Sequence, residues 1–111
     1  MIVTTTDTVP GREFDCWVGL VKGCSVRGAH AGDDIIAGMK NALGGEVHEY
    51  TRVLAQVREQ ALDRMIHNAR ALGADAIVGV RLCSSEIGEG VAELIAYGTA
   101  VRLKPVSAGA D

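Results

Sequence analysis

The stretch EVHEYTRVLAQVREQALDRMIHNARALGADAIVGVRLC (residues 46–83) carries the clearest structural signal in this 111-residue chain. Its first part, residues 46–72, repeats apolar side chains at spacings of three and four, which is one stripe of an amphipathic helix. Gly73 follows the last apolar residue and predicts the end of the helix. Residues 74–83 then predict a strand. The apolar stripe consists of Tyr50, Leu54, Val57, Ala61, Met65, Ala69 and Leu72.

Further strands are predicted on both sides of this stretch. Residues 91–103 predict a final strand, joined to the previous one by a loop at 84–90. Towards the N-terminus, residues 2–5 and 13–24 predict a short strand and a longer one. Alternation along the longer strand would place Phe14, Cys16, Val18 and Leu20 on one face, and Trp17 and Val21 on the other.

A short helix is predicted between the longer strand and the long helix. Asp33 would begin it, since an acidic residue can cap the free N–H groups of a first turn. Gly44-Gly45 would end it. The whole pattern is that of an α+β domain.

We predict that the last two strands pair as an antiparallel hairpin centred on Ile87. In that register Arg81 lies opposite Glu93, so that a cation faces an anion. Likewise Cys83 lies opposite Val91 and Ile77 opposite Tyr97. One face of the hairpin is then aliphatic and suits packing under the long helix. That face consists of Val78, Val80, Leu82, Ala92, Leu94 and Ala96.

The second face of this hairpin is also apolar, because it carries Ile77, Val91, Ile95 and Tyr97. An antiparallel sheet ordinarily leaves one polar face in water. A small domain with few aromatic residues and many glycines also has a thin core, and association is a common remedy. We therefore expect another subunit to cover this face. The alternative is that the two N-terminal strands fold over it within one chain.

Composition and charge exclude several classes of protein. With 48% hydrophobic and 23% charged residues the chain has enough apolar material to fold. A net charge of −3 and scattered basic residues disfavour nucleic acid as a partner. No apolar run approaches the ~20 residues that span a bilayer. The first residues also lack a signal-peptide pattern, so we expect a cytoplasmic protein without a membrane partner, with its three cysteines as free thiols.

No motif indicates a bound metal ion. Cys16 and Cys24 would lie ~26 Å apart in a straight strand, and His48 and His67 ~28 Å apart on one helix. Only a site between subunits could combine such ligands. The simpler interpretation is that the cysteines are small apolar residues and the histidines surface residues.

Nucleophilic catalysis and phosphate binding are also weakly indicated. Cys83 has no base in the neighbouring sequence, which favours a structural thiol. The glycine-containing segment 27–32 precedes a predicted helix, as a phosphate loop would. However, Asp33 and Asp34 put negative charge where a phosphate would bind. Gly44-Gly45 also precedes a predicted helix, but Glu46 follows at once and puts negative charge there too. Helix capping explains both segments better.

Five segments, in order and spacing, resemble the YbjQ-like family, which is also described as a heavy-metal-binding domain. They span residues 1–103 and are specific in combination. The resemblance implies a dodecin-like subunit, in which an antiparallel sheet packs on one long and one short helix, assembled as a ring-shaped pentamer. It supplies no ligand set. The segments are MIVTTTD (1–7), RGAHAGDDIIAG (27–38), GGEVHEYT (44–51), GADAIVGVR (73–81) and AYGTAV (96–101).

Positions that match the family's characteristic polar and aromatic residues are Arg27, Asp33, Glu49, Tyr50, Glu93 and Tyr97. Together with Arg81, three of these give our candidate ligand-binding set: Arg27, Arg81, Glu93 and Tyr97. A small molecule would bind there at a subunit interface.

We interpret residues 1–104 as one domain and 105–111 as a flexible tail. The preferred function is an oligomeric binding or scaffold module with no catalytic site and no cofactor. One alternative is a heavy-metal site formed across subunits by Cys83, Cys16 or His30. The other is an enzyme with an interface active site that uses Glu93 and Arg81.

Overall fold

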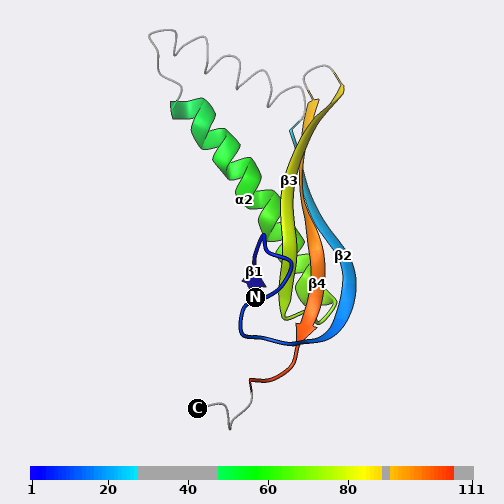
Figure 1. The fold of residues 1–111 in the computed structure, drawn as a ribbon. Helices are drawn as coiled ribbons and strands as arrows, with labels where there is room; N and C mark the ends of the chain where they lie inside the picture. Colours follow the sequence, from blue (N-terminus) through cyan, green and yellow to red (C-terminus); the bar gives the residue numbers. More distant parts are fainter. Residues whose placement is uncertain (28–47, 89–90, 107–111) are drawn as a thin grey trace.

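The computed structural model describes residues 1–27, 48–88 and 91–106, and contains one sheet and one long helix (Figure 1). Strands β3 and β4 form an antiparallel hairpin, β2 pairs antiparallel with β4, and β1 pairs parallel with β3. The order across the sheet is β1-β3-β4-β2. The sheet is therefore mixed, and the prediction of a wholly antiparallel sheet is wrong. The elements are β1 (Ile2–Val3), β2 (Phe14–Arg27), α2 (His48–Ala71), β3 (Ala76–Gly88) and β4 (Val91–Leu103).

The long helix confirms the middle of the apolar stripe predicted from the sequence, whereas Leu72 at its end is 54% exposed. Val57, Ala61, Met65 and Ala69 are buried against the sheet. The helix ends as predicted at Gly73, which adopts a positive φ of 77°. There the Gly73 N–H donates to the Arg70 carbonyl (3.0 Å) and the Ala74 N–H to the Ala69 carbonyl (3.1 Å), which is a Schellman cap. None of the described helical residues forms a segment apolar and long enough to cross a bilayer. The predicted short helix lies outside the described residues.

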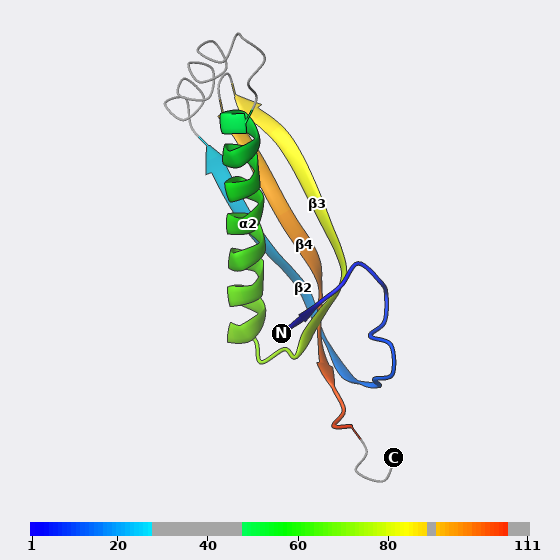
Figure 2. The ribbon, with the colours of Figure 1, turned by 90° about the vertical axis from the view of Figure 1, so that its left-hand side faces the viewer.

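Helix α2 lies along β2 and β4 on one face of the sheet (Figure 2). Its small residues Ala61 and Ala69 flank Met65, and all three are fully buried. They pack on a cluster of strand side chains, so the principal core lies between α2 and the sheet. The strand residues in that core are Val21, Ile77, Val80, Ala96 and Ala100.

A β-bulge in β3 exchanges the faces predicted for its first residues. Val78 pairs with Thr99 and Arg81 with Tyr97, so two residues, Gly79 and Val80, lie opposite the single residue between those partners. Gly79 has φ +62°, the left-handed conformation of a glycine bulge. As a result Ile77 faces the helix and Val78 the opposite side, contrary to the prediction. Val80 packs in the helix-side core as predicted.

Two further irregularities change the predicted faces of β2. Asp15 and Val18 are extra residues relative to β4, since register shifts lie between Phe14 and Cys16 and between Trp17 and Gly19. Val18 therefore packs towards the helix beside Val21. Trp17 pairs with Val101 on the opposite side. The simple alternation predicted for 13–24 is wrong for this reason.

The face of the sheet opposite α2, here called the outer face, is covered only at the end where the chain begins. Val9, from the segment between β1 and β2, packs there on a second small cluster with Phe14. The same segment bonds to β3, with Gly79 N–H donating to the Thr6 carbonyl at 2.8 Å. The segment between β1 and β2 thus covers part of this face. The two strands themselves lie in the sheet and do not fold over it, contrary to the alternative prediction. The residues of that cluster are Val9, Ala76, Val78, Val101 and Leu103.

The other end of the outer face, and its margin on β2, have no cover from the described residues. Trp17 and Leu20 pair with Val101 and Thr99, level with the covered cluster but on the edge strand. Leu20 is 71% exposed and Trp17 62% exposed, although both are large and apolar. Val26 and Tyr97 on the same face are also exposed. Single exposed apolar residues are normal, but a contiguous group is typical of an interface.

Candidate functional site

Three successive rows of side chains cross the uncovered part of the outer face. Residues paired across antiparallel strands share a face, so each row takes one residue from β2, β4 and β3 in turn. The rows are Lys22–Tyr97–Arg81, Cys24–Ile95–Cys83 and Val26–Glu93–Ser85. A cationic row therefore lies on one side of a thiol row, and an acidic residue on the other.

The predicted Arg81–Glu93 pair does not form. Arg81 lies opposite Tyr97, and Glu93 lies opposite Ser85. The register differs from the prediction because β3 continues to Gly88, which pairs with Val91. Four residues along a strand separate the two positions, or ~13 Å.

The Arg81 side chain is used within the chain instead. Its Nη1 atom donates to the Thr5 carbonyl at 3.0 Å and to the Val80 carbonyl at 2.8 Å. Arg81 thereby fastens the N-terminal segment to β3. This arrangement explains an exposed arginine beside apolar strand residues without a ligand.

The four predicted ligand residues are only partly brought together. Tyr97 lies between Lys22 and Arg81, and Glu93 lies two rows away. Arg27 is the last residue of β2, and its backbone pairs with Ala92, next to the Val26–Glu93 pair. All four positions belong to β2, β3 and β4, but they do not converge on one point.

Sequence reasoning missed the relation between two cysteines. Cys24 and Cys83 both pair with Ile95, from opposite sides, and share the outer face. Two strand spacings separate them, or ~10 Å. That distance exceeds the Cα separation of a disulfide, and all three cysteines are free. Only the register shows this relation, because the two residues are far apart in the chain.

The described residues do not gather three metal-ligating side chains at any one place. Cys16 is exposed and its backbone pairs with Arg102, away from the other two cysteines. His67 is an exposed residue of α2. His30 lies outside the described residues. The part of the chain that is described therefore supplies two thiols on one face rather than a closed coordination shell.

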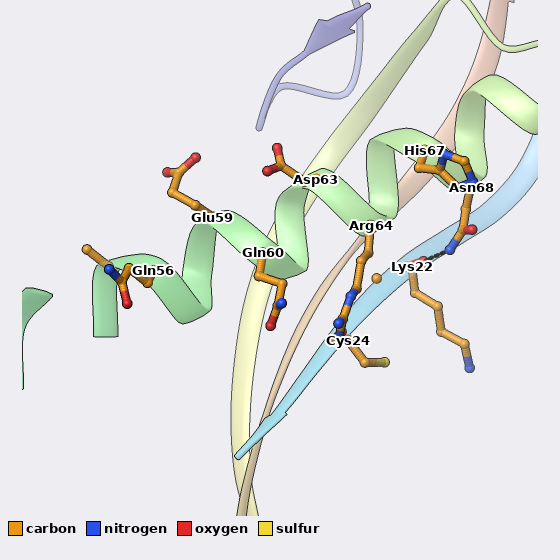
Figure 3. Close-up of a pocket in the computed structure, with 11 residues that line it drawn as sticks. Lys22, Cys24, Gln56, Glu59, Gln60, Asp63, Arg64, His67 and Asn68 are labelled. Carbon is orange, nitrogen blue, oxygen red and sulfur yellow. Dashed lines mark hydrogen bonds between the residues drawn. The ribbon is translucent and has the colours of Figure 1, made fainter. Parts of the chain in front are cut away.

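A groove of about 880 Å³ runs between α2 and the free edge of β2. Figure 3 shows Arg64 and Asn68 reaching from the helix to the strand. Arg64 Nη1 donates to the Cys24 carbonyl at 2.6 Å, and Asn68 Nδ2 to the Lys22 carbonyl at 2.8 Å. The residues that line the groove carry both signs of charge, since Lys22 and Arg64 line it together with Glu59 and Asp63. The groove favours no single class of small ion.

The one fully buried polar side chain among the described residues is that of Ser25. Its hydroxyl donates to Gln60 Oε1 at 2.6 Å. Because its partner is an amide and not a base, Ser25 is a structural hydroxyl rather than an activated nucleophile.

Comparison with known proteins gives one consistent result. A family profile described as "Putative heavy-metal-binding" (YbjQ_1) matches residues 1–104. The chain belongs to the YbjQ family. Relatives named "UPF0145 protein" include one from Archaeoglobus fulgidus, 55% identical over 104 residues, covering 94% of this chain and 96% of the relative. Another, from Shewanella frigidimarina, is 48% identical over 105 residues, covering 95% and 98%.

The fold of this YbjQ-family chain also resembles a solved structure. The crystal structure of a protein of unknown function in the DUF74 family, from Pediococcus pentosaceus, has a TM-score of 0.61. It covers 94% of this chain and 98% of its own, at 16% sequence identity. The likeness concerns the fold alone. The YbjQ family membership read from the sequence segments is thus confirmed, and the α+β class with it.

Proposed function

We propose that this chain is one subunit of a homo-oligomer in which a second copy covers the uncovered part of the outer face. The observation that carries the proposal is the exposure of four large apolar side chains on one side of the sheet: Trp17, Leu20, Val26 and Tyr97. A dodecin-like ring would place this surface at each subunit boundary, and the number five follows from the family resemblance. The unpaired cysteines suit the reducing cytoplasm.

The assembled protein would act as a binding or scaffold module rather than as an enzyme. Support comes from Arg81 and Glu93, the two side chains that were candidates for an interface active site. Arg81 is occupied by backbone carbonyls, and Glu93 lies ~13 Å from it along the strands. A ligand would then bind where Tyr97, Lys22 and Glu93 of one copy meet the next copy.

Opposite faces of the sheet offer a matched test of this interface. Leu20 is exposed on the outer face, whereas Leu82 is a 45% exposed leucine of β3 on the helix side. Leu20→Glu removes about 1.5–3 kcal/mol of apolar burial from each interface and adds the cost of burying a carboxylate. We expect light scattering on a size-exclusion column to show dissociation of Leu20→Glu and an unchanged mass for Leu82→Glu. Equal masses for both variants and the wild type would reject the outer face as the interface.

A heavy-metal site is the second candidate function. It is favoured by the shared row of Cys24 and Cys83 and by the description of the family. A single ion cannot bridge thiols ~10 Å apart in one chain, so ligands from two copies would be needed.

Elemental analysis of the purified protein tests this candidate. Metal content should fall in the Cys24→Ser/Cys83→Ser variant and stay unchanged in Cys16→Ser, which alters the cysteine outside the row. A metal content well below one ion per subunit that neither variant changes would end it.

A further inference from the structure

Among the described residues, β2 lies at one edge of the sheet, and this edge borders α2. Backbone groups of successive strand residues point alternately to the two sides of a strand. The carbonyls of Lys22 and Cys24 accept bonds from α2, so these residues point away from β4. An exposed edge of this kind is a template on which the strand of another chain can add.

Two side chains of α2 occupy this edge. Arg64 and Asn68 are four residues apart, or ~6.0 Å along the helix. Cys24 and Lys22 are two residues apart, or ~6.6 Å along the strand. Because the spacings match, each side chain meets one outward carbonyl, at 2.6 and 2.8 Å. Figure 3 shows both side chains lying across the strand edge.

Close approach of the helix makes this arrangement possible. At Gly23, between the two bonded carbonyls, any Cβ atom would run into the backbone of Ala61 and Met65. The helix axis is therefore near enough for a side chain as short as asparagine to reach the edge. Ser25 and Gln60 extend the same line of contacts by a further bond of 2.6 Å.

We infer that Arg64 and Asn68 close the β2 edge to strand addition by a second copy. An added strand needs the outward carbonyls of alternate residues as acceptors, and it needs the space beside them. At Lys22 and Cys24, Arg64 and Asn68 bond to the outward carbonyls and fill the space beside them. This inference rests on the proposed function. Its consequence is that copies join through the outer face and cannot also polymerise through the β2 edge. The two side chains thus determine which surface of the subunit is available for assembly.

Sedimentation velocity of the full chain over a concentration series tests the inference. We expect the wild type to form one species of fixed size. Arg64→Ala/Asn68→Ala should add larger species whose mass grows with concentration, because open-ended strand addition has no closed end point. Arg58→Ala/Arg70→Ala is the matched control, since it changes two exposed residues of the same helix. It should behave as the wild type.

A third change identifies the edge as the cause. Lys22→Pro, added to the double variant, removes an outward N–H and should eliminate the larger species. Larger species that persist would overturn the inference, and so would a folded double variant with the wild-type size distribution. If the double variant fails to fold, the single variants Arg64→Ala and Asn68→Ala replace it; two folded single variants of wild-type size would likewise overturn it. A monomeric wild type would refute the proposed oligomer alone, and growth of the double variant would still support the closed edge.

Discussion

The contact of α2 with the backbone of β2 at Gly23 can be tested by adding a single methyl group. In Gly23→Ala the new Cβ would meet the Met65 nitrogen and the Ala61 oxygen, and it would lie 2.8 Å from the Arg64 carbonyl carbon. Cβ atoms essentially never approach other heavy atoms within 3.0 Å. All three opposing atoms belong to the helix backbone, so no side chain can turn away. The helix itself must move by on the order of 1 Å.

The expected cost follows from what that movement separates. Ala61, Met65 and Ala69 pack directly on the sheet with no exposed surface, and a gap of 0.5–1 Å forfeits roughly a quarter to a half of their dispersion energy. Overpacking a core costs about 1–3 kcal/mol. The lower chain entropy of unfolded alanine returns about 0.4–1 kcal/mol. We therefore expect a net loss of roughly 1–2 kcal/mol in the free energy of unfolding.

Thermal denaturation at fixed protein concentration measures this loss. A domain of this size loses about 4–8 °C in Tm per kcal/mol. Gly73→Asn is the control, because Gly73 has φ +77° with no heavy atom near its Cβ, and asparagine tolerates that conformation. We expect Gly73→Asn to stay within a few degrees of the wild type. An unchanged Tm for Gly23→Ala would refute the close contact between helix and strand.

Three further changes test other parts of the fold by denaturant unfolding. Met65→Ala should cost about 2–5 kcal/mol, because it empties the centre of the core; a cost below 1 kcal/mol would mean that α2 does not pack there. Ser25→Ala should cost about 1 kcal/mol through the lost bond to Gln60, and no change in stability would contradict that bond. Asp75→Ala should also cost about 1 kcal/mol, since the Asp75 Oδ2 atom accepts a hydrogen bond from the Leu103 N–H at 2.8 Å. Amide exchange at Leu103 should accelerate in this variant, and unaltered exchange would contradict that hydrogen bond.

Strong periodic signals in the sequence predicted most of the described elements. The helix predicted at 46–72 is His48–Ala71, and the strand predicted at 91–103 is Val91–Leu103. Both depend on patterns that burial imposes on the sequence. The stop at Gly73 was also predictable, because a Schellman cap needs a residue with positive φ.

Register and strand direction could not be predicted, for physical reasons that particular residues show. The polar residues Ser84 and Ser85 resemble a loop, yet they pair with Leu94 and Glu93 as exposed residues of a strand. The bulge at Gly79 shifts the pairing by one residue. A single glycine in a strand sequence is not enough to predict such a bulge. A two-residue strand such as β1 has too few positions to reveal its direction.

The candidate site depended on that register, so its errors followed from the same cause. Once β3 extended to Gly88, Arg81 moved from Glu93 to Tyr97, and Cys83 moved from Val91 to Ile95. The second shift placed Cys83 in one row with Cys24. Beyond the bulge, where the predicted faces of Arg81 and Cys83 are correct but their register is displaced, the prediction identifies a surface but not the pairs of residues within it.

The account depends most on the outer face being buried by another copy, and Trp17 reports on that face directly. It is the single tryptophan of the chain, and it is 62% exposed in the isolated subunit. Its ring packs edge to face on that of Phe14, with the ring centroids 4.7 Å apart. Its fluorescence can be recorded while the protein is diluted from the assembled to the dissociated state, with the helical circular dichroism followed in parallel. We predict a short-wavelength emission maximum at high concentration that moves to longer wavelength on dilution without loss of helix. An emission maximum typical of an exposed tryptophan at every concentration would contradict the account.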